Sequence, residues 1–151
     1  MMMLRLGAGV RMNREQWSIM MQVEPTAKGR ARHSRMGRTY TPEKTRMKEE
    51  EIRYWLIKND APKFEGPLKV AMGFGFKRPK SVSKKKRPYH TVKPDLTNVA
   101  KLVEDAANEV LWHDDSQIVD MRIYKFYTES PYILLTVEQI STDHPIDPEK
   151  P

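Results

Sequence analysis

Hydrophobic residues are spaced as in strands in four parts of the chain. Residues 68–76 place a large apolar side chain at every second position, which is the period of a half-buried strand. Residues 118–126 alternate in the same way, and the apolar residues of 132–139 indicate a last strand. Residues 17–23 have the apolar density of a strand, and Pro25 marks its end. We expect residues 17–23 to form the first ordered strand.

Two other segments have the spacing and end signals of helices. Thr41 suits a cap and Pro42 a first helical position, so a helix is predicted over 42–59, with its buried stripe at Ile52, Trp55 and Leu56. A second helix is predicted over 95–110, with Asp95 as its cap. Its core stripe comprises Val99, Leu102, Val103, Ala106 and Val110, and another face carries Asn98, Lys101 and Asp105.

These elements predict an α+β fold with a small mixed sheet of four or five strands and two main helices. The 151 residues suit one core. We expect a flexible extension over 1–16, a domain over 17–140 that contains a basic loop at 77–93, and a flexible tail over 141–151. No apolar run is long enough to cross a membrane.

Composition adds two constraints. The chain has no cysteine, which excludes disulfides, thiolate metal sites and cysteine nucleophiles, and is compatible with a reducing cytoplasm. The amino terminus lacks the apolar centre and cleavage site of a secretory signal. Any metal must therefore bind through oxygen or one of the four histidines.

The net charge of +7 is divided unevenly along the chain. Residues 1–93 hold 23 Lys and Arg against 8 Asp and Glu, whereas residues 94–151 hold 4 against 12. Because one core contains both parts, we expect a basic field beside an acidic patch. This arrangement suits a polyanion held near carboxylates that bind cations. A basic tail on an acidic domain is the simpler alternative.

Two basic segments are candidates for contact with nucleic-acid phosphates. The loop at 77–93 has eight Lys and Arg residues and no acid, and the stretch that follows Lys28 is rich in arginine. Both could instead be solvated loops that aid solubility, and the first could be a targeting signal. The predicted DNA contacts are Lys28, Arg30, Arg32, Lys84, Lys85, Lys86 and Arg87.

Acidic residues at two positions suggest a metal site. Asp95 starts the second helix, and Asp114 and Asp115 lie in the polar turn that follows it. If folding brings these segments together, their oxygens suit a hard divalent cation such as Mg²⁺. Otherwise Asp95 is only a cap, the two turn acids are solvated, and Lys101 and Asp105 form an exposed i,i+4 pair.

Four segments in order resemble the RusA family of Holliday junction resolvases. They are residues 28–32 (KGRAR), 40–45 (YTPEKT), 93–106 (KPDLTNVAKLVEDA) and 112–119 (WHDDSQIV). The resemblance spans about residues 18–140. It implies a small dimeric, magnesium-dependent endodeoxyribonuclease that cuts four-way DNA junctions, of a kind commonly encoded by phages or prophages, and hence a bacterial or phage-infected cell.

The resemblance also implies roles for individual residues. Asp95 and Asp115 match metal-binding carboxylates, and Lys101 matches the catalytic lysine, so Asp95, Lys101 and Asp115 form the expected catalytic set. Asp114 and Asp105 are supporting residues at most. The implied cofactor is Mg²⁺, and the implied partners are branched DNA and a second copy of the chain.

Thr97 departs from the family pattern. Members often have an aspartate two residues after the position of Asp95, and a hydroxyl there removes a unit charge from the cation's shell. We therefore expect weaker metal binding or turnover, for which Asp114, or a water held by Thr97 and Asn98, could compensate. Thr97 could also be only a helix cap.

Two other functions fit the sequence. The first is a non-catalytic nucleic-acid-binding module whose acidic cluster serves folding or dimerisation, and Thr97 is its best support. The second is a small RNA-binding protein of ribosomal type, which only the pI of about 9.6 and the Lys and Arg density suggest.

Overall fold

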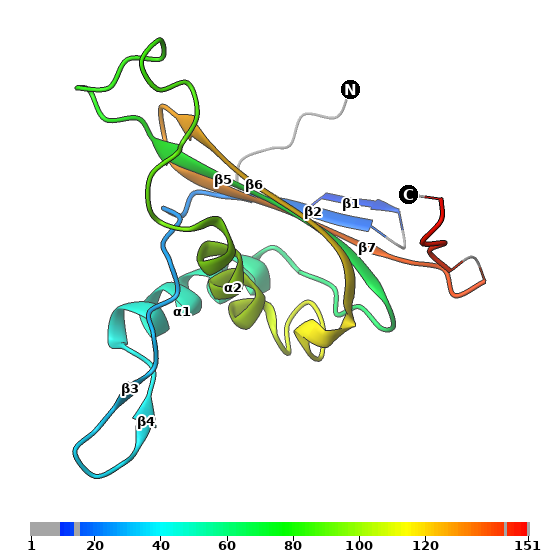
Figure 1. The fold of residues 1–151 in the computed structure, drawn as a ribbon. Helices are drawn as coiled ribbons and strands as arrows, with labels where there is room; N and C mark the ends of the chain where they lie inside the picture. Colours follow the sequence, from blue (N-terminus) through cyan, green and yellow to red (C-terminus); the bar gives the residue numbers. More distant parts are fainter. Residues whose placement is uncertain (1–9, 14–15, 144, 151) are drawn as a thin grey trace.

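A five-stranded mixed sheet and two helices form the body of the chain (Figure 1). This computed structural model describes residues 10–13, 16–143 and 145–150. The sheet order is β1-β2-β7-β5-β6, in which β5 and β6 are parallel and the other neighbouring pairs antiparallel. The strands are β1 (Val10–Asn13), β2 (Gln16–Met21), β5 (Leu68–Lys77), β6 (Ile118–Thr128) and β7 (Tyr132–Gln139). The predicted α+β class is confirmed.

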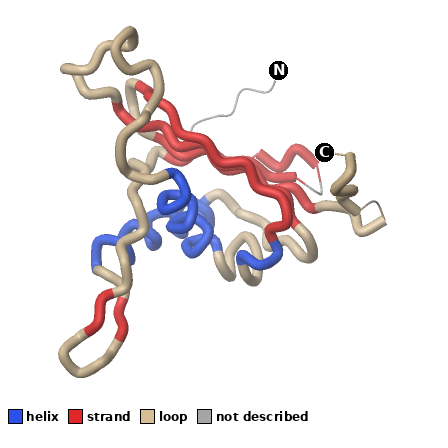
Figure 2. Tube along the Cα trace, viewed as in Figure 1, coloured by secondary structure: helices blue, strands red, loops and turns tan. Residues whose placement is uncertain are grey.

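Both helices cover the same face of the sheet (Figure 2). They are α1 (Glu43–Lys58) and α2 (Leu96–Ala107). The alternation predicted for β5 is observed, because its apolar positions are buried. The large side chains of the core include Trp17, Ile19, Leu56, Phe74, Leu102, Trp112 and Ile133. Burial of these apolar side chains is the main favourable contribution to folding.

Several element boundaries differ from the prediction. The N-cap of α1 is Pro42 rather than Thr41, and no side chain caps the helix. The second helix ends at Ala107 rather than at Val110, although Val110 still packs against the core. Thr97 is the second residue of α2, so it is not a helix cap. Asp95 is the N-cap, but its side chain accepts no capping hydrogen bond.

Strand β1 was not predicted, so the predicted first strand is in fact the second. Strand β1 lies within the segment 1–16, which was predicted to be flexible, and it pairs with β2. Residues 1–9 and 14–15 of that segment, and His144 and Pro151 of the predicted tail, lie outside the described residues. The described residues of the tail contain no helix or strand.

The arginine-rich stretch after Lys28 folds as a hairpin. Strands β3 (Arg32–His33) and β4 (Thr39–Tyr40) pair with each other in a separate two-stranded sheet. The hairpin projects from the body on the side of α1 (Figure 1). The stretch therefore forms an arm, which we call the β3–β4 arm (residues 30–40).

The connection between β5 and β6 carries most of the chemistry expected from the sequence. Since these strands are parallel, the chain must cross back over the sheet between them, and it does so through α2. The connection contains the basic loop, then Asp95 at the start of α2, and then the short helix η1 (Asp115–Gln117) directly before β6. Asp95 and the turn with Asp114 and Asp115 therefore both lie in this one connection.

The basic loop is held to the sheet although residues 78–94 form no helix or strand. The Arg78 guanidinium lies 4.2 Å from the ring centre of Tyr127 and donates to the Arg87 carbonyl at 2.5 Å. Lys125 on β6 donates to the carbonyls of Val92 at 2.8 Å and Pro94 at 2.9 Å. These bonds fix the chain immediately before Asp95.

His90 anchors the same loop from within. Its ring is stacked on Phe76 with centroids 4.2 Å apart, lies 4.9 Å from Tyr127, and is only 7% exposed. Its buried Nδ1 has no hydrogen-bond partner among the described residues. Burial lowers the pKa of His90, and the positive charges of Lys125 and Arg87 lower it further. The loop is thus held by a neutral imidazole.

Acid should weaken this anchor. Histidine in the unfolded chain has a pKa of about 6.5. Because the pKa of folded His90 is lower, the unfolded chain binds more protons than the folded chain as the pH falls below that value. The stability that comes from the neutral His90 ring is therefore present above a pH of about 6.5 and is lost as the pH falls toward the folded pKa. We expect the fall in Tm between pH of about 7.5 and about 5.5 to be smaller in His90→Phe, which keeps the stack without the titration. Thermal unfolding followed by circular dichroism measures the fall in Tm of the parent protein and of His90→Phe. Equal falls in the two proteins would show that His90 is not the group responsible.

Candidate active site

Lys101 lies at the centre of an acidic cluster at the surface of α2. Its Nζ lies 2.6 Å from an Asp115 carboxylate oxygen, 3.4 Å from Asp105 and 4.0 Å from Glu104. The hydrogen bond to Asp115 raises the pKa of Lys101 against the lowering effect of burial, and the negative charges of Asp115, Glu104 and Asp114 raise it further. The lysine is therefore a full cation at neutral pH.

Asp115 is held by the turn in which it lies. Asp114 precedes η1 as its N-cap and accepts a hydrogen bond from the Ser116 N–H at 3.1 Å. Gln117 completes a capping box, since its side-chain oxygen accepts from the N–H groups of His113 and Asp114. Hydrogen bonding by Ser116, first through its side chain and then through its backbone N–H, lowers the pKa of Asp114. Asp114 is thus an exposed carboxylate committed to the turn that presents Asp115.

Asp95 presents an exposed side chain at the entrance of α2. It makes no capping bond, and Lys125 holds the backbone that precedes it. Lys101 follows six residues later, about 9 Å along the helix axis. Thr97 is exposed on the first turn and brings no charge. The helix thus presents one free carboxylate at its start and one lysine further along.

Glu104 is a site residue that was not predicted from the sequence. Burial raises the pKa of Glu104, and the negative charge of Asp115 raises it further against the lowering effect of Lys101. The available signal was its position three residues after Lys101, which places both on one side of a helix. Glu104 therefore belongs to the cluster around Lys101.

Lys28 has partners within the protein. Its ammonium pairs with Asp105 and lies 4.0 Å from Glu49, and its backbone N–H donates to the Asn98 carbonyl at 3.1 Å. The DNA contact of Lys28 stays a prediction, and in this structure its ammonium neutralises an acid of the cluster. An alternating series of charges thus connects Glu49, Lys28, Asp105, Lys101 and Asp115.

The residue after Lys28 fixes the root of the arm. The Gly29 N–H donates to the buried Thr45 hydroxyl at 2.9 Å. A Cβ at position 29 would lie 2.6 Å from that oxygen, so only glycine allows this approach without displacement. The chain beyond Lys28 is therefore held against α1.

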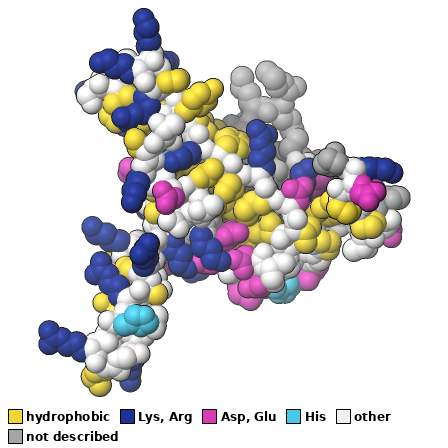
Figure 3. Space-filling model, in the orientation of Figure 1, with side chains coloured by type: hydrophobic (Ala, Val, Ile, Leu, Met, Phe, Trp, Pro, Cys, Tyr) yellow, Lys and Arg dark blue, Asp and Glu magenta, His cyan; other side chains and the backbone are white. Residues whose placement is uncertain are grey.

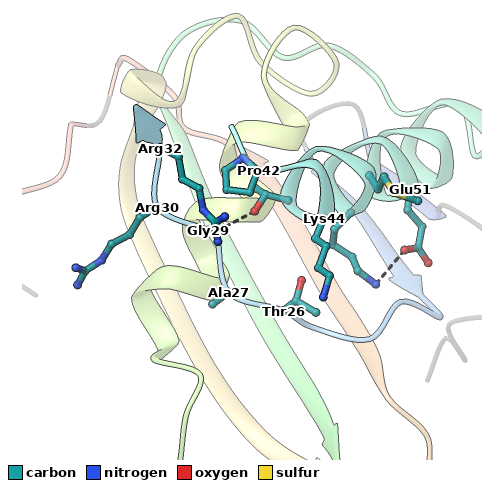
Figure 4. Close-up of a pocket in the computed structure, with 11 residues that line it drawn as sticks. Thr26, Ala27, Gly29, Arg30, Arg32, Pro42, Lys44 and Glu51 are labelled. Carbon is teal, nitrogen blue, oxygen red and sulfur yellow. Dashed lines mark hydrogen bonds and ion pairs between the residues drawn. The ribbon is translucent and has the colours of Figure 1, made fainter. Parts of the chain in front are cut away.

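A cavity of about 840 Å³ opens between the root of the arm and α1 (Figure 4). Arg30, Arg32 and Lys44 contribute positive charge to its lining, while Lys48 is paired with Glu51 at 3.0 Å. In Figure 4, Arg30 points away from the cavity and Arg32 turns toward Gly29 and Pro42. The basic surface thus continues from the body onto the arm.

Lys and Arg side chains gather on two projections, the β3–β4 arm and the basic loop (Figure 3). Lys84, Lys85 and Lys86 are exposed, and Arg87 is half-buried with a guanidinium nitrogen 3.5 Å from the Tyr127 hydroxyl. Acidic side chains gather on the body between the projections. The expected combination of a basic field and an acidic patch is present.

The donor groups around the cluster limit how a metal could be held. Among the described residues, no group of three or more Asp, Glu or His side chains is arranged to hold a metal ion. In the same part of the chain, no helix has the length and apolar character needed to cross a membrane.

Comparisons with known proteins identify the family of the chain. The family model described as "Endodeoxyribonuclease RusA" matches residues 22–138. The chain is also 32% identical over 131 residues to the "Uncharacterized protein YqaN" of Bacillus subtilis strain 168, a match that covers 78% of this chain and 92% of YqaN. The matched region contains Lys28, both helices and the turn with Asp115. The chain belongs to the RusA endodeoxyribonuclease family.

Proposed function

We propose that this chain is a magnesium-dependent endonuclease that resolves four-way DNA junctions by paired phosphodiester hydrolysis. Family membership supports an endonuclease that acts on such junctions. The observation that carries the catalytic assignment is the 2.6 Å contact between Lys101 and Asp115. It joins a cation and a carboxylate from two separate segments, both of which the family resemblance marks as catalytic.

The acidic residues suit Mg²⁺ in donor type and in number. Magnesium usually binds one or two protein carboxylates, several waters and the phosphates of its substrate. Asp95 and Asp115 would hold it, with a contribution from Asp114 or Thr97. When bound, the ion would polarise the scissile phosphate and lower the pKa of an attacking water.

Lys101 has a separate role in the proposed reaction. In-line attack on phosphorus increases the negative charge on the non-bridging oxygens and on the leaving oxygen. The raised pKa of Lys101 keeps its ammonium protonated to meet that charge. Asp115, Asp105 and Glu104 hold the ammonium at the site before the substrate arrives.

The two basic projections would hold the DNA by its phosphates. Arg30 and Arg32 on the arm, and Lys84–Lys86 with Arg87 on the loop, provide these contacts, while Lys28 supports the cluster from within. Phosphate contacts carry no sequence information. Selectivity for a junction would therefore come from shape, and a homodimer with two-fold symmetry could address opposed strands at the crossover.

Two observations favour the alternative of a binding module without catalysis. Thr97 stands where the family often has an aspartate, and the described residues form no group of three metal-binding side chains. In that case the basic projections would bind DNA, and the acidic cluster would serve folding or dimerisation.

Junction cleavage separates the two proposals. A synthetic four-way junction and a linear duplex are incubated with the protein in Mg²⁺ or in chelator, and we expect paired symmetric nicks only in the junction with Mg²⁺. In Asp115→Asn, binding of the junction should stay within about threefold, and nicking should fall by at least about 10³-fold, because the change removes one charge without altering shape. Junction binding by the parent protein without nicks would favour the binding module.

The Lys101→Met variant tests the role of the Lys101 ammonium, because methionine removes the charge and keeps an unbranched side chain of similar length. Removal of one preorganised group that stabilises the transition state costs about 10²–10³-fold in rate, so single-turnover nicking should fall by that factor while junction affinity is retained. Lys44→Met, which removes an exposed lysine of the arm cavity, is the matched control. A Lys101→Met variant that nicks at the parental rate would exclude the proposed role.

Thr97→Asp tests whether the missing carboxylate limits the reaction. Position 97 is exposed in the first turn of α2, where a negative charge is also favourable to the helix. We expect half-maximal nicking at a lower Mg²⁺ concentration, whereas the neutral control Thr97→Asn should behave like the parent. An unchanged Mg²⁺ titration in Thr97→Asp would show that this position lies outside the cation's shell.

A further inference from the structure

The β3–β4 arm is a preorganised ribbon that stands clear of the body. Its two strands pair Arg32 with Tyr40 and His33 with Thr39. Every residue from Arg35 to Thr41 is exposed, and Met36 at the tip is 85% exposed. A large apolar side chain held in water at the end of an arm is a feature that folding does not explain.

The tip of the arm is ordered by its own hydrogen bonds. The Ser34 N–H donates to the Arg38 carbonyl at 2.8 Å, and the Gly37 N–H donates to the Ser34 carbonyl at 3.0 Å. The Arg38 N–H also donates to the Ser34 hydroxyl at 3.1 Å. Gly37 has a φ of 75°, which glycine adopts without strain. The turn thus presents Arg35, Met36 and Arg38 together.

The charge of the arm identifies its partner as a polyanion. No acidic residue lies between Glu24 and Glu43, whereas Arg30, Arg32, Arg35 and Arg38 lie in that interval. In Figure 3 the arm carries dark blue side chains along its length. Repulsion among these arginines is relieved when phosphates surround them.

The dimensions of the arm select one groove of duplex DNA. Two paired strands lie about 4.8 Å apart, and their side chains point to the two faces of the ribbon. The major groove is about 12 Å wide and admits a two-stranded ribbon, whereas the minor groove is about 6 Å wide. An apolar side chain at the tip also suits base edges in the major groove, where thymine presents a methyl group.

We propose that the β3–β4 arm enters the major groove of one duplex arm of the DNA junction. Its arginines contact phosphates on both walls of the groove, and Met36 reaches the base edges. The inference rests on the proposed function, because that function makes branched DNA the substrate. It adds that the protein holds a duplex arm away from the point of cleavage.

The absence of cysteine allows a direct test. Met36→Cys creates a single thiol, to which an iron chelate that releases hydroxyl radicals is attached. Cuts from a major-groove source are offset toward the 5′ ends of the two strands, and those from a minor-groove source toward the 3′ ends. We expect 5′-offset cuts within one duplex arm of the four-way junction. Ile146→Cys, at an exposed position of the segment that follows β7, is the labelled control and should give no such cuts.

A salt titration provides a second measurement. Removal of one phosphate contact should reduce the slope of log affinity against log salt by about 0.9. Arg35→Gln and Arg38→Gln should each lower the slope, whereas Lys58→Gln, at the exposed end of α1, should leave it unchanged.

The outcomes distinguish the inference from the proposed function. If the labelled Met36→Cys protein binds the junction but gives 3′-offset cuts or none, or if neither arginine variant changes the slope, the arm does not enter the major groove. The proposed function would then still stand on the nicking assay. A protein that fails to bind junction DNA would overturn both.

Discussion

The contact between Lys101 and Asp115 joins the two segments on which the site depends. Without the ammonium, the carboxylates of Asp115, Asp105 and Glu104 would repel one another at the end of α2. The lysine neutralises part of this charge and draws the turn before β6 against the helix. The cluster is therefore a local balance of charge in which the acids are close together because a cation lies among them.

The same balance extends to the basic side of the molecule. Lys28 pairs with Asp105, and the next residue, Gly29, is fixed to α1 through Thr45. Partly exposed ion pairs of this kind add about 0–1 kcal/mol each, so the core rather than this series supplies the stability of the fold. The series of ion pairs instead fixes a position, because it holds the start of the β3–β4 arm beside the acidic cluster.

Local patterns predicted those parts of the structure that depend on neighbouring residues. The alternation of β5 and the apolar stripe of α2 each identified an element, because one face of each element is buried. The family resemblance supplied the roles of Lys101 and Asp115. The pairing of Lys28 with Asp105 joins residues 77 positions apart, and no local pattern indicates such a contact. Strand β1 was missed because its four residues alternate too briefly to be recognised.

The order of the strands has a consequence for synthesis of the chain. Strand β7 is the last to emerge from a ribosome, yet it is the central strand of the sheet, between β2 and β5. Until residue 139 is available, the nascent chain has two apolar strand edges with no partner, which is the condition that favours association with other chains. Completion of the fold, and with it assembly of the acidic cluster against the finished sheet, therefore waits for synthesis of β7.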